Sequence, residues 1–429
     1  MNILMMTNTY TPIVGGLEKS VQLFTDEYLK RGHDVRIVAP IFPDMPSDEK
    51  NVIRVPAIQH FNGSDFSVHL PVPGVLKEAL QGFKPDIVHA HHPFLIGDTA
   101  LRVAYKFNAP LVFTYHTLYE QYSNYVPGDS HALKRFTVQL STGFASLADR
   151  VFAPSESVKK ILIEREVQTP IEVISTGISR GTHAKGDGET FRQQLGIPSD
   201  CFIVGCVGRL ALEKNLEFLS KAVLKFLKAS ENSVFVVIGS GPEEKNIRRI
   251  FSEAGLSRRL FMAGVLKGEN LANAYAALNV FAFASQSETQ GMVLVEAMAA
   301  GVPVVAVDAC GVRDVVENGK NGRLLPVEDE EMFAWALGEI ANFTPEEQKQ
   351  MIAEAKKTAE GLTMDICAEK ALRNYQEVLK EKRTRHRAQK DSRWAAAKGL
   401  IRAEWDIFKN ITKATGAVMK SDEEVFAKA

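Results

Sequence analysis

Short apolar runs rich in β-branched residues alternate with longer segments of helical period along most of the chain. This alternation is typical of parallel sheets that carry helices on both faces. In the first half the predicted strands are 2–7, 34–40, 52–57, 86–91, 110–116, 150–155 and 171–177. In the second half they are 202–208, 234–241, 260–266, 279–285 and 302–308.

A segment without apolar period separates the two sets of strands. Residues 179–190 are rich in glycine and polar residues, which is typical of a linker. A chain of 429 residues also exceeds what one hydrophobic core usually organises. The pattern predicts an α/β fold of two doubly wound, Rossmann-like domains, 1–180 and 181–380, that face each other across a cleft. The last helix of the second domain is free to pack back on the first, and ligands are expected at the carboxyl ends of the strands.

The bulk composition excludes some classes of protein. Lys plus Arg number 51 and Asp plus Glu 52, so the whole chain gives no reason to expect binding to nucleic acid. The four cysteines are scattered, and Cys201 and Cys206 would point to opposite faces of one strand. No stretch of about 18 predominantly apolar residues occurs, and the N-terminus resembles no export signal. We therefore expect reduced thiols and a cytoplasmic protein without a membrane span.

A glycine pair follows the first predicted strand. Gly15 and Gly16 precede a segment whose apolar positions, Leu17, Val21 and Phe24, repeat at helical spacing. Glycines before a helix N-terminus allow backbone N–H groups to approach a phosphate closely. A simple tight turn remains the alternative. The third glycine of the dinucleotide-binding pattern is absent, which disfavours a hydride-transferring enzyme.

The second half carries charged residues at the ends of predicted strands. Arg209 and Lys214 follow one strand and are suited to neutralise a diphosphate. Glu288 lies in a loop before a helix and Glu296 lies within that helix, where a carboxylate would accept hydrogen bonds from the hydroxyls of a sugar. Gly291 is predicted at the start of this helix, with unpaired backbone amides at Met292 and Val293. The alternatives are solvated basic residues and a paired structural acid.

Four motifs together carry a resemblance to a known family. The glycine pair after the first strand, "GRLALEK", "ETQGMVLVEAMAAGVPVV" and "NGRLLP" resemble the retaining glycosyltransferases of family 4, which have the GT-B fold. The resemblance extends to about Lys380. It implies a nucleotide-sugar donor, with the diphosphate on Arg209 and Lys214, hydroxyls of the transferred sugar on Glu288 and the ribose on Glu296. It further implies phosphate contacts from Gly15, Gly16, Gly291, Met292 and Val293, a base bordered by Val265 and Leu266, and a sugar beside His116.

The predicted chemistry requires no metal or cofactor. Departure of a nucleoside diphosphate builds negative charge, which two cations and helix-end amides can stabilise. The sequence contains no Asp-x-Asp pair of the kind that would bind a metal. A metal site at His89, His91 and His92 is the alternative, but no cysteine or carboxylate at usable spacing completes a ligand set.

Two stretches bear on the acceptor. Tyr115, Tyr119, Tyr122 and Tyr125 lie close to His116, in a segment that looks like the corresponding one of bacterial diacylglycerol glucosyltransferases. We assign these tyrosines to the acceptor side, with a loop core as the alternative. The tail, 381–429, is predicted to be a basic amphipathic helix, because 11 Lys or Arg stand against four acids between Lys380 and Lys413. Such a helix would lie on an anionic membrane through Trp394, Lys398, Arg402 and Trp405.

Other roles for the tail remain open. Its tryptophan side could pack on the body of the enzyme, or the segment could be a basic arm for another partner. One departure weakens the membrane interpretation, since the segment 73–84 carries only two lysines where lipid-acting family members can have a strongly basic helix.

The residues and the resemblance together predict a metal-independent hexosyltransferase at the inner face of the cell membrane. Retention at the anomeric carbon is implied by the resemblance alone. The enzyme would move glucose from UDP-glucose onto a lipid acceptor such as diacylglycerol. One alternative is transfer to a soluble or polyprenyl-linked glycan in cell-envelope assembly, and another is a non-catalytic nucleotide-sugar-binding module. A hydrolysing epimerase shares the fold but is disfavoured by the spacing of Glu288 and Glu296.

Overall fold

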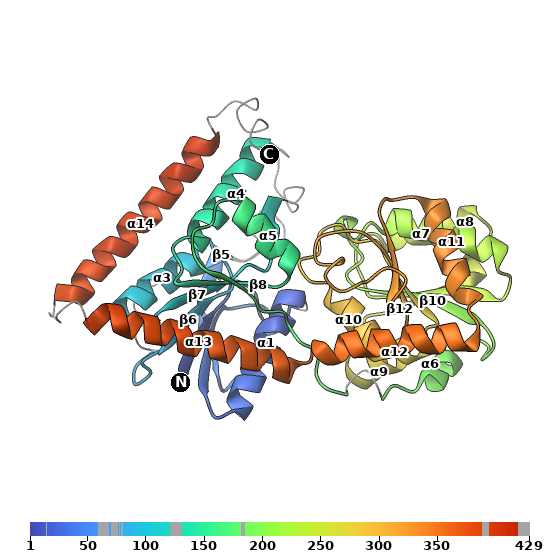
Figure 1. The fold of residues 1–429 in the computed structure, drawn as a ribbon, viewed down its shortest axis with the longest axis horizontal. Coiled ribbons are helices and arrows are strands. Elements are labelled where there is room, and N and C mark those ends of the chain that lie inside the picture. The colour runs from blue at the N-terminus through green and yellow to red at the C-terminus, as the bar shows by residue number, and fades with distance from the viewer. Residues whose placement is uncertain are drawn as a thin grey trace. The chain divides into compact units, whose positions relative to one another are not determined.

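The chain forms two compact units (Figure 1). The computed structural model describes residues 1–13, 15–58, 68–69, 76, 78, 80–120, 131–181, 185–387 and 394–418. The first unit comprises residues 1–175 and 368–429, and the second comprises residues 176–367.

The first unit is built on a seven-stranded parallel sheet. Its strand order is β3-β2-β1-β6-β7-β8-β9, and every neighbouring pair is parallel. The strands are β1 (Asn2–Met6), β2 (Asp34–Pro40), β3 (Val52–Val55), β6 (Ile87–Ala90), β7 (Leu111–Thr114), β8 (Arg150–Ala153) and β9 (Ile171–Val173). Two further short strands, β4 (Ala57–Ile58) and β5 (Val68–His69), form an antiparallel pair.

Helices cover this sheet because its central strands are apolar on both faces. All four residues from Ile3 to Met6 in β1 are fully buried, as parallel strands between two helical layers require. The helices are α1 (Gly16–Lys30), α3 (Ile96–Phe107), α4 (His131–Ala145), α5 (Glu156–Glu164), α14 (Trp394–Val418) and, from residue 368 onward, α13 (Met364–Arg387). Figure 1 shows α14, in red, beside α3 and α4, and these two helices are its main contacts.

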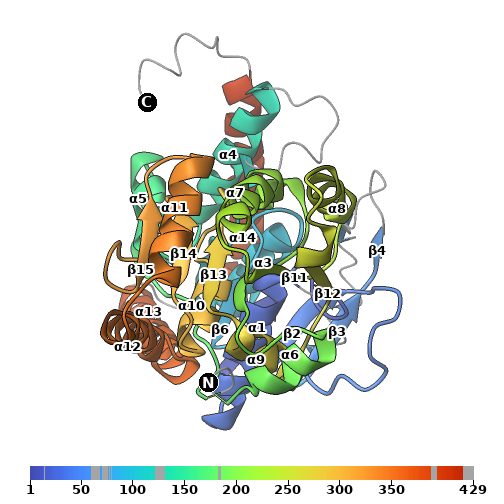
Figure 2. The same cartoon turned by 90° about the vertical axis from the view of Figure 1, so that its right-hand side faces the viewer.

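The second unit is built on a six-stranded parallel sheet of order β12-β11-β10-β13-β14-β15 (Figure 2). The strands are β10 (Phe202–Val207), β11 (Ser233–Ile238), β12 (Leu260–Gly264), β13 (Val280–Phe283), β14 (Val304–Val307) and β15 (Gly322–Leu325). The helices are α6 (Gly188–Leu195), α7 (Leu216–Ala229), α8 (Glu244–Glu253), α9 (Gly268–Ala277), α10 (Met292–Ala299), α11 (Glu330–Ala341) and α12 (Pro345–Gly361).

Alternating side chains divide the second unit into two core layers. Ile203 of β10 points into a core shared with α6, α9, α10 and α12, whereas its neighbour Val204 points into a core shared with α7, α8 and α11. Cys201 and Cys206 lie in these two different layers, as predicted, and all four cysteines are free thiols.

The strand predictions and the fold class are confirmed. Each of the predicted runs contains a strand of the structure, and both sheets are parallel with helices on both faces. In each sheet the strand order reverses once, between β1 and β6 in the first unit and between β10 and β13 in the second. At such a reversal the loops that leave the two strands diverge, which opens a place for a ligand at their carboxyl ends.

Candidate functional site

Two predicted residues meet where the strand order of the second sheet reverses. Lys214 ends the short 3₁₀ helix Leu212–Lys214 after β10, and Glu288 lies in the loop after β13. The Nζ atom of Lys214 lies 2.5 Å from Oε1 of Glu288. A small cavity of about 20 Å³ lies here, lined by Lys214, Arg209 and the ends of both strands. A strand-end loop on each side therefore contributes one charge to this pair.

Arg209 occupies the same loop and has its own carboxylate partner. Its guanidinium pairs with Glu213, four residues further along the chain. The Glu213 side chain is only 8% exposed, whereas that of Arg209 is 50% exposed. The arginine therefore reaches solvent from a buried anchor, which leaves part of it accessible to an anionic ligand. Glu213 was not singled out in the sequence, although its i,i+4 spacing from Arg209 is a recognisable signal.

The helix α10 begins at this site. Its N-cap, Gly291, has a φ of 73°, and a Cβ atom there would lie 2.8 Å from Cδ1 of Leu294. Glycine is therefore favoured by the left-handed backbone, and a larger residue would also have to displace the buried side chain of Leu294. Met292 and Val293 are the first helical residues, whose N–H groups have no partner within a helix and carry its positive dipole end.

Glu296 is a buried carboxylate on the same helix. Its side chain is 3% exposed, and its Oε2 atom accepts a hydrogen bond of 2.9 Å from the hydroxyl of Tyr275 on α9. Burial, together with the charge of Glu296, raises the pKa of Tyr275 well above its usual 10. Tyr275 therefore stays protonated and holds the carboxylate in place. It was missed in the sequence because a buried tyrosine at helical spacing looks like any core residue.

Val265 and Leu266 follow β12 at the same edge of this sheet. Val265 is 55% exposed, while Leu266 is partly buried against the core layer of α9 and α10. An exposed valine beside an anchored leucine is compatible with the predicted border of a base.

In the first unit, the glycine pair lies where predicted, at the start of α1. Gly15 is the N-cap of α1, and a Cβ atom there would collide with the carboxylate of Glu18. Gly16 has open space around it.

The loop before this glycine pair is held by one arginine. Arg54 donates to both carboxylate oxygens of Glu49 at 2.7 and 2.6 Å. It also donates to the backbone carbonyl oxygens of Thr11 and Pro40, at 2.8 Å each. Its guanidinium lies 5.8 Å from the ring centroid of Tyr10. The loop from β1 to α1 is therefore fixed from β3, which sequence reasoning did not anticipate.

His116 follows β7 and contacts a second histidine. Its Nε2 atom lies 2.9 Å from Nδ1 of His91, which follows β6, and the rings stack at 28°. Burial lowers the pKa of both well below the usual 6.5, with added repulsion from neighbouring imidazoles, so both are neutral at pH 7.

The neighbouring histidines are used as hydrogen-bonding groups. His89 contacts the hydroxyl groups of Tyr375 at 2.6 Å and Thr114 at 2.7 Å. Nδ1 of His92 accepts a hydrogen bond of 3.1 Å from the backbone N–H of Asn8. Within the described part of the chain, no group of three or more His, Cys, Asp or Glu side chains is arranged to hold a metal ion.

The predicted acceptor-side tyrosines differ in their placement. Tyr115 is fully buried, with its hydroxyl 3.0 Å from Oγ of Ser141, so it occupies a core position and not an exposed contact surface. Tyr119 packs edge-on against Phe94 and Tyr115. Tyr122 and Tyr125 lie outside the described residues.

The predicted membrane residues lie on α14. Arg402 and Trp405 are exposed, and Trp394 and Lys398 belong to the helix, although their side chains lie outside the described part. The alternative in which the tryptophan side packs on the enzyme is wrong for Trp405, which is 55% exposed. None of the described helices combines the length and apolar character that crossing a membrane requires.

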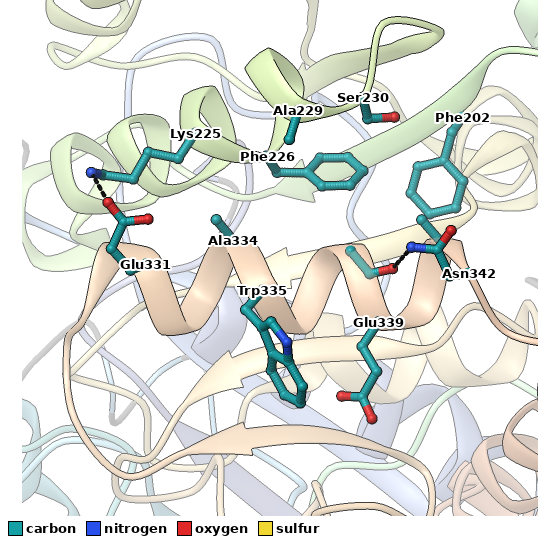
Figure 3. A pocket seen from close by; sticks show the side chains of 12 residues that line it. Phe202, Lys225, Phe226, Ala229, Ser230, Glu331, Ala334, Trp335, Glu339 and Asn342 are labelled. Atoms are coloured by element: carbon teal, nitrogen blue, oxygen red, sulfur yellow. Dashed lines mark hydrogen bonds and ion pairs between the residues drawn. The ribbon is translucent and has the colours of Figure 1, made fainter.

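A larger hollow lies elsewhere on the second unit. It measures about 610 Å³ and lies between α7 and α11 (Figure 3). Phe202 lines it from the amino end of β10, and Lys225 pairs with Glu331 at one end. The hollow therefore lies away from the strand ends that carry Lys214 and Glu288.

The chain matches two protein-family models and is similar to several known proteins. Residues 14–180 match the model of Glycosyltransferase Family 4, and residues 187–358 match that of Glycosyl transferases group 1. An alpha-monoglucosyldiacylglycerol synthase of Acholeplasma laidlawii is 28% identical over 335 residues, which cover 75% of this chain and 84% of the relative. A GDP-mannose-dependent alpha-mannosyltransferase of Mycolicibacterium smegmatis is 29% identical over 389 residues, which cover 88% of this chain and 98% of the relative.

A solved structure has a similar fold. The crystal structure of HepE from Anabaena, in complex with UDP, superimposes with a TM-score of 0.67 at 21% identity and covers 88% of this chain and all of that one.

Proposed function

Because this chain belongs to the glycosyltransferases of family 4, with the GT-B fold, we propose that it transfers a hexose from a nucleotide sugar to a lipid acceptor. The donor we propose is UDP-glucose and the acceptor diacylglycerol. The observation that carries the proposal is the meeting of Lys214 and Glu288 at 2.5 Å, beside Arg209 and the start of α10.

This constellation suits the two halves of a sugar diphosphate. Arg209, Lys214 and the first amides of α10 supply positive charge where a departing diphosphate would develop negative charge. Glu288 would accept hydrogen bonds from the transferred sugar, and Glu296, held by Tyr275, would accept them from the ribose. Because these groups can stabilise the leaving diphosphate themselves, we propose transfer without a metal, and with retention at the anomeric carbon.

The lipid acceptor is supported by the relatives that act on diacylglycerol and by the exposed aromatic residues of α14. We accordingly propose that the enzyme works on the cytosolic face of the cell membrane, with His116 beside the transferred sugar. Transfer of mannose from GDP-mannose is a second candidate, because relatives named for that donor match the chain over 88% of its length.

A product assay tests the proposal. The protein would be incubated with UDP-glucose, UDP-galactose, UDP-N-acetylglucosamine or GDP-mannose. The acceptors would be vesicles that contain or lack diacylglycerol and, in parallel, a soluble and a polyprenyl-linked glycan. We expect a glucosylated diacylglycerol by mass spectrometry only when UDP-glucose and diacylglycerol are both present. Formation of a mannolipid from GDP-mannose would show that the donor is GDP-mannose and not UDP-glucose. Product on a soluble or polyprenyl-linked glycan would show that the acceptor is that glycan and not diacylglycerol. Donor binding without turnover on any acceptor would indicate a non-catalytic binding module.

A further inference from the structure

The helix α14 packs on α3 and α4 of the first unit through a face of small and aliphatic residues. Ala403 and Ala414 are fully buried and Ile407 is 6% exposed. Asn410 donates to the carbonyl oxygen of Leu140 on α4 at 3.1 Å, and a Cβ atom at Gly143 would collide with its side chain. The side of α14 that faces the unit is therefore fitted closely to α4.

The opposite side of α14 exposes large apolar residues. Ile401 is 73% exposed, Trp405 55%, Phe408 59% and Ile411 45%. The rings of Trp405 and Phe408 stack with centroids 5.9 Å apart. Isolated apolar residues on a surface are common, but an aromatic and aliphatic stripe along one helix marks an interaction surface.

The acids of α14 are paired, although the Glu404 side chain is still 59% exposed and Asp406 also lies 3.9 Å from Arg402. The acid Glu404 is held by Arg102 of α3 at 2.6 and 3.0 Å, and Asp406 accepts from the hydroxyl of Tyr105 at 3.1 Å. The cations Lys409 and Lys413 lie among the exposed positions, and Nζ of Lys409 lies 5.1 Å from the centroid of the Trp405 ring. Both acids of the described part of α14 thus bond to α3, and the exposed stripe carries net positive charge.

We propose that this face of α14, which consists of Ile401, Arg402, Trp405, Phe408, Lys409, Ile411 and Lys413, docks in the interface of an anionic membrane with the helix axis parallel to it. A stripe one helix wide with flanking cations matches a lipid surface, where the aromatic rings enter the headgroup region and the lysines meet phosphate. An enzyme whose acceptor is dissolved in the membrane must reach the membrane surface, so the inference rests on the proposed function.

The docking face is also connected to the neighbourhood of His116. Leu140 of α4 bonds to α14, and the next residue, Ser141, contacts the hydroxyl of Tyr115, which directly precedes His116. One helix therefore separates the proposed membrane face from the loop after β7.

Binding to vesicles of phosphatidylcholine with or without phosphatidylglycerol tests the inference with the full chain. We expect binding only to the anionic vesicles, and loss of that binding at high salt. The double variant Trp405→Ser with Phe408→Ser should bind at least about tenfold more weakly. The variant Lys409→Glu with Lys413→Glu should lose about fivefold or more for each cation.

Matched controls come from exposed residues of the second unit. Trp335→Ser removes a tryptophan that is 66% exposed, and Lys349→Glu reverses an exposed lysine, and neither should change vesicle binding. These point changes test the face more sharply than deletion of all residues after Lys382, which would also uncover the packing face of Ala403 and Ile407.

The two proposals can fail separately. Unchanged vesicle binding in both α14 variants would overturn the docking inference, as would self-association of the protein that is lost in these variants without any vesicle binding. Turnover of diacylglycerol solubilised in detergent should be the same in the variants as in the original protein, because no membrane is involved. If no glycolipid forms in detergent while the α14 variants still lose vesicle binding, the proposed function fails and the docking face stands.

Discussion

His91 and His116 meet through their ring nitrogens, with Nδ1 of His91 2.9 Å from Nε2 of His116. Both are neutral, so one hydrogen must lie between the two nitrogens. The other nitrogen of His91 lies 3.2 Å from Sδ of Met5, a thioether that accepts hydrogen bonds weakly and cannot donate them. The arrangement favours a hydrogen on Nε2 of His91 and a second on Nε2 of His116, which leaves the lone pair of His116 on Nδ1.

His91 is thus expected to act as a positioning residue that selects the tautomer of His116. The variant His91→Leu should lower kcat by about tenfold to a hundredfold with little change in the KM of the donor, because the ring of His116 loses its fixed tautomer. His91→Asn, which keeps an acceptor near the position of Nδ1, should recover part of the loss. The pH–rate profile should shift in His91→Leu but not in His91→Asn. If the role of His91 were purely structural, both variants would lose thermal stability and the pH–rate profile would be unchanged.

The buried histidines predict an acid-sensitive first unit. Burial lowers the pKa of His89 and His92 from 6.5 to about 3, and it lowers that of His91 and His116 as well. The unfolded chain therefore binds more protons than the folded chain below pH 6.5. Stability is fully present above this pH and is lost as the pH falls toward the folded pKa values, by about 1.4 kcal/mol per pH unit for each histidine.

Urea unfolding between pH 7 and about pH 5 measures this loss. In the variant His92→Asn, the free energy of unfolding should decline less steeply with falling pH, by the slope that corresponds to one proton. The asparagine amide can still accept a hydrogen bond from the backbone of Asn8, but it does not titrate. An equal slope in both proteins would mean that His92 is not buried in its neutral form.

Local chemistry explains which parts of the structure could be predicted from the sequence. Runs of Val and Ile between two helical layers have few other conformations, so the central strands are recognisable. The edge strand β15 was missed because it contains Arg323, which pairs with Glu339 of α11 instead of packing in the core. The helical period of α14 could be predicted, but which side would face α4 depended on how Gly143 accommodates Asn410, a contact between distant segments.

The same limit holds for the site. Lys214 and Glu288 could be predicted because they stand in the motifs "GRLALEK" and "ETQGMVLVEAMAAGVPVV", whereas charged residues at strand ends alone are more often solvated. Tyr275 and Arg54 act only through the residues they hold, and their spacing resembles that of ordinary core or surface residues. Glu213 differs, because its i,i+4 spacing from Arg209 is a local signal that can be read from the sequence. The supporting contacts of Tyr275 and Arg54 become visible only when the fold brings their segments together.

Glu288 is expected to be essential for transfer but not for binding of the nucleotide. The variant Glu288→Ala should lower the rate of transfer by at least about a hundredfold, because the transferred sugar loses its carboxylate contact. UDP binding, measured by calorimetry, should persist, since Lys214 and Arg209 remain. Glu331→Ala removes the carboxylate paired with Lys225 on the surface of the same unit and serves as the control, with an unchanged rate. A Glu288→Ala enzyme of normal rate would refute the assigned role.

Tyr275 tests whether Glu296 binds the ribose. The variant Tyr275→Phe keeps the buried ring beside Phe281 but removes one hydrogen bond to the Glu296 carboxylate. Such a bond to a charged group is worth about 1.5 kcal/mol, but it is present with and without donor. Donor affinity should therefore fall by at most about tenfold, to the extent that the carboxylate is misplaced. If Glu296 contacts the ribose hydroxyls, the original protein binds UDP more tightly than 2′-deoxy- or 3′-deoxy-UDP, and this preference should shrink in Tyr275→Phe. The control Tyr375→Phe loses a buried hydroxyl that contacts His89 in the first unit, so it should leave the preference intact. Equal loss of affinity for UDP and for both deoxy analogues in Tyr275→Phe would instead assign Glu296 a structural role, because only a contact with the missing hydroxyl distinguishes these ligands.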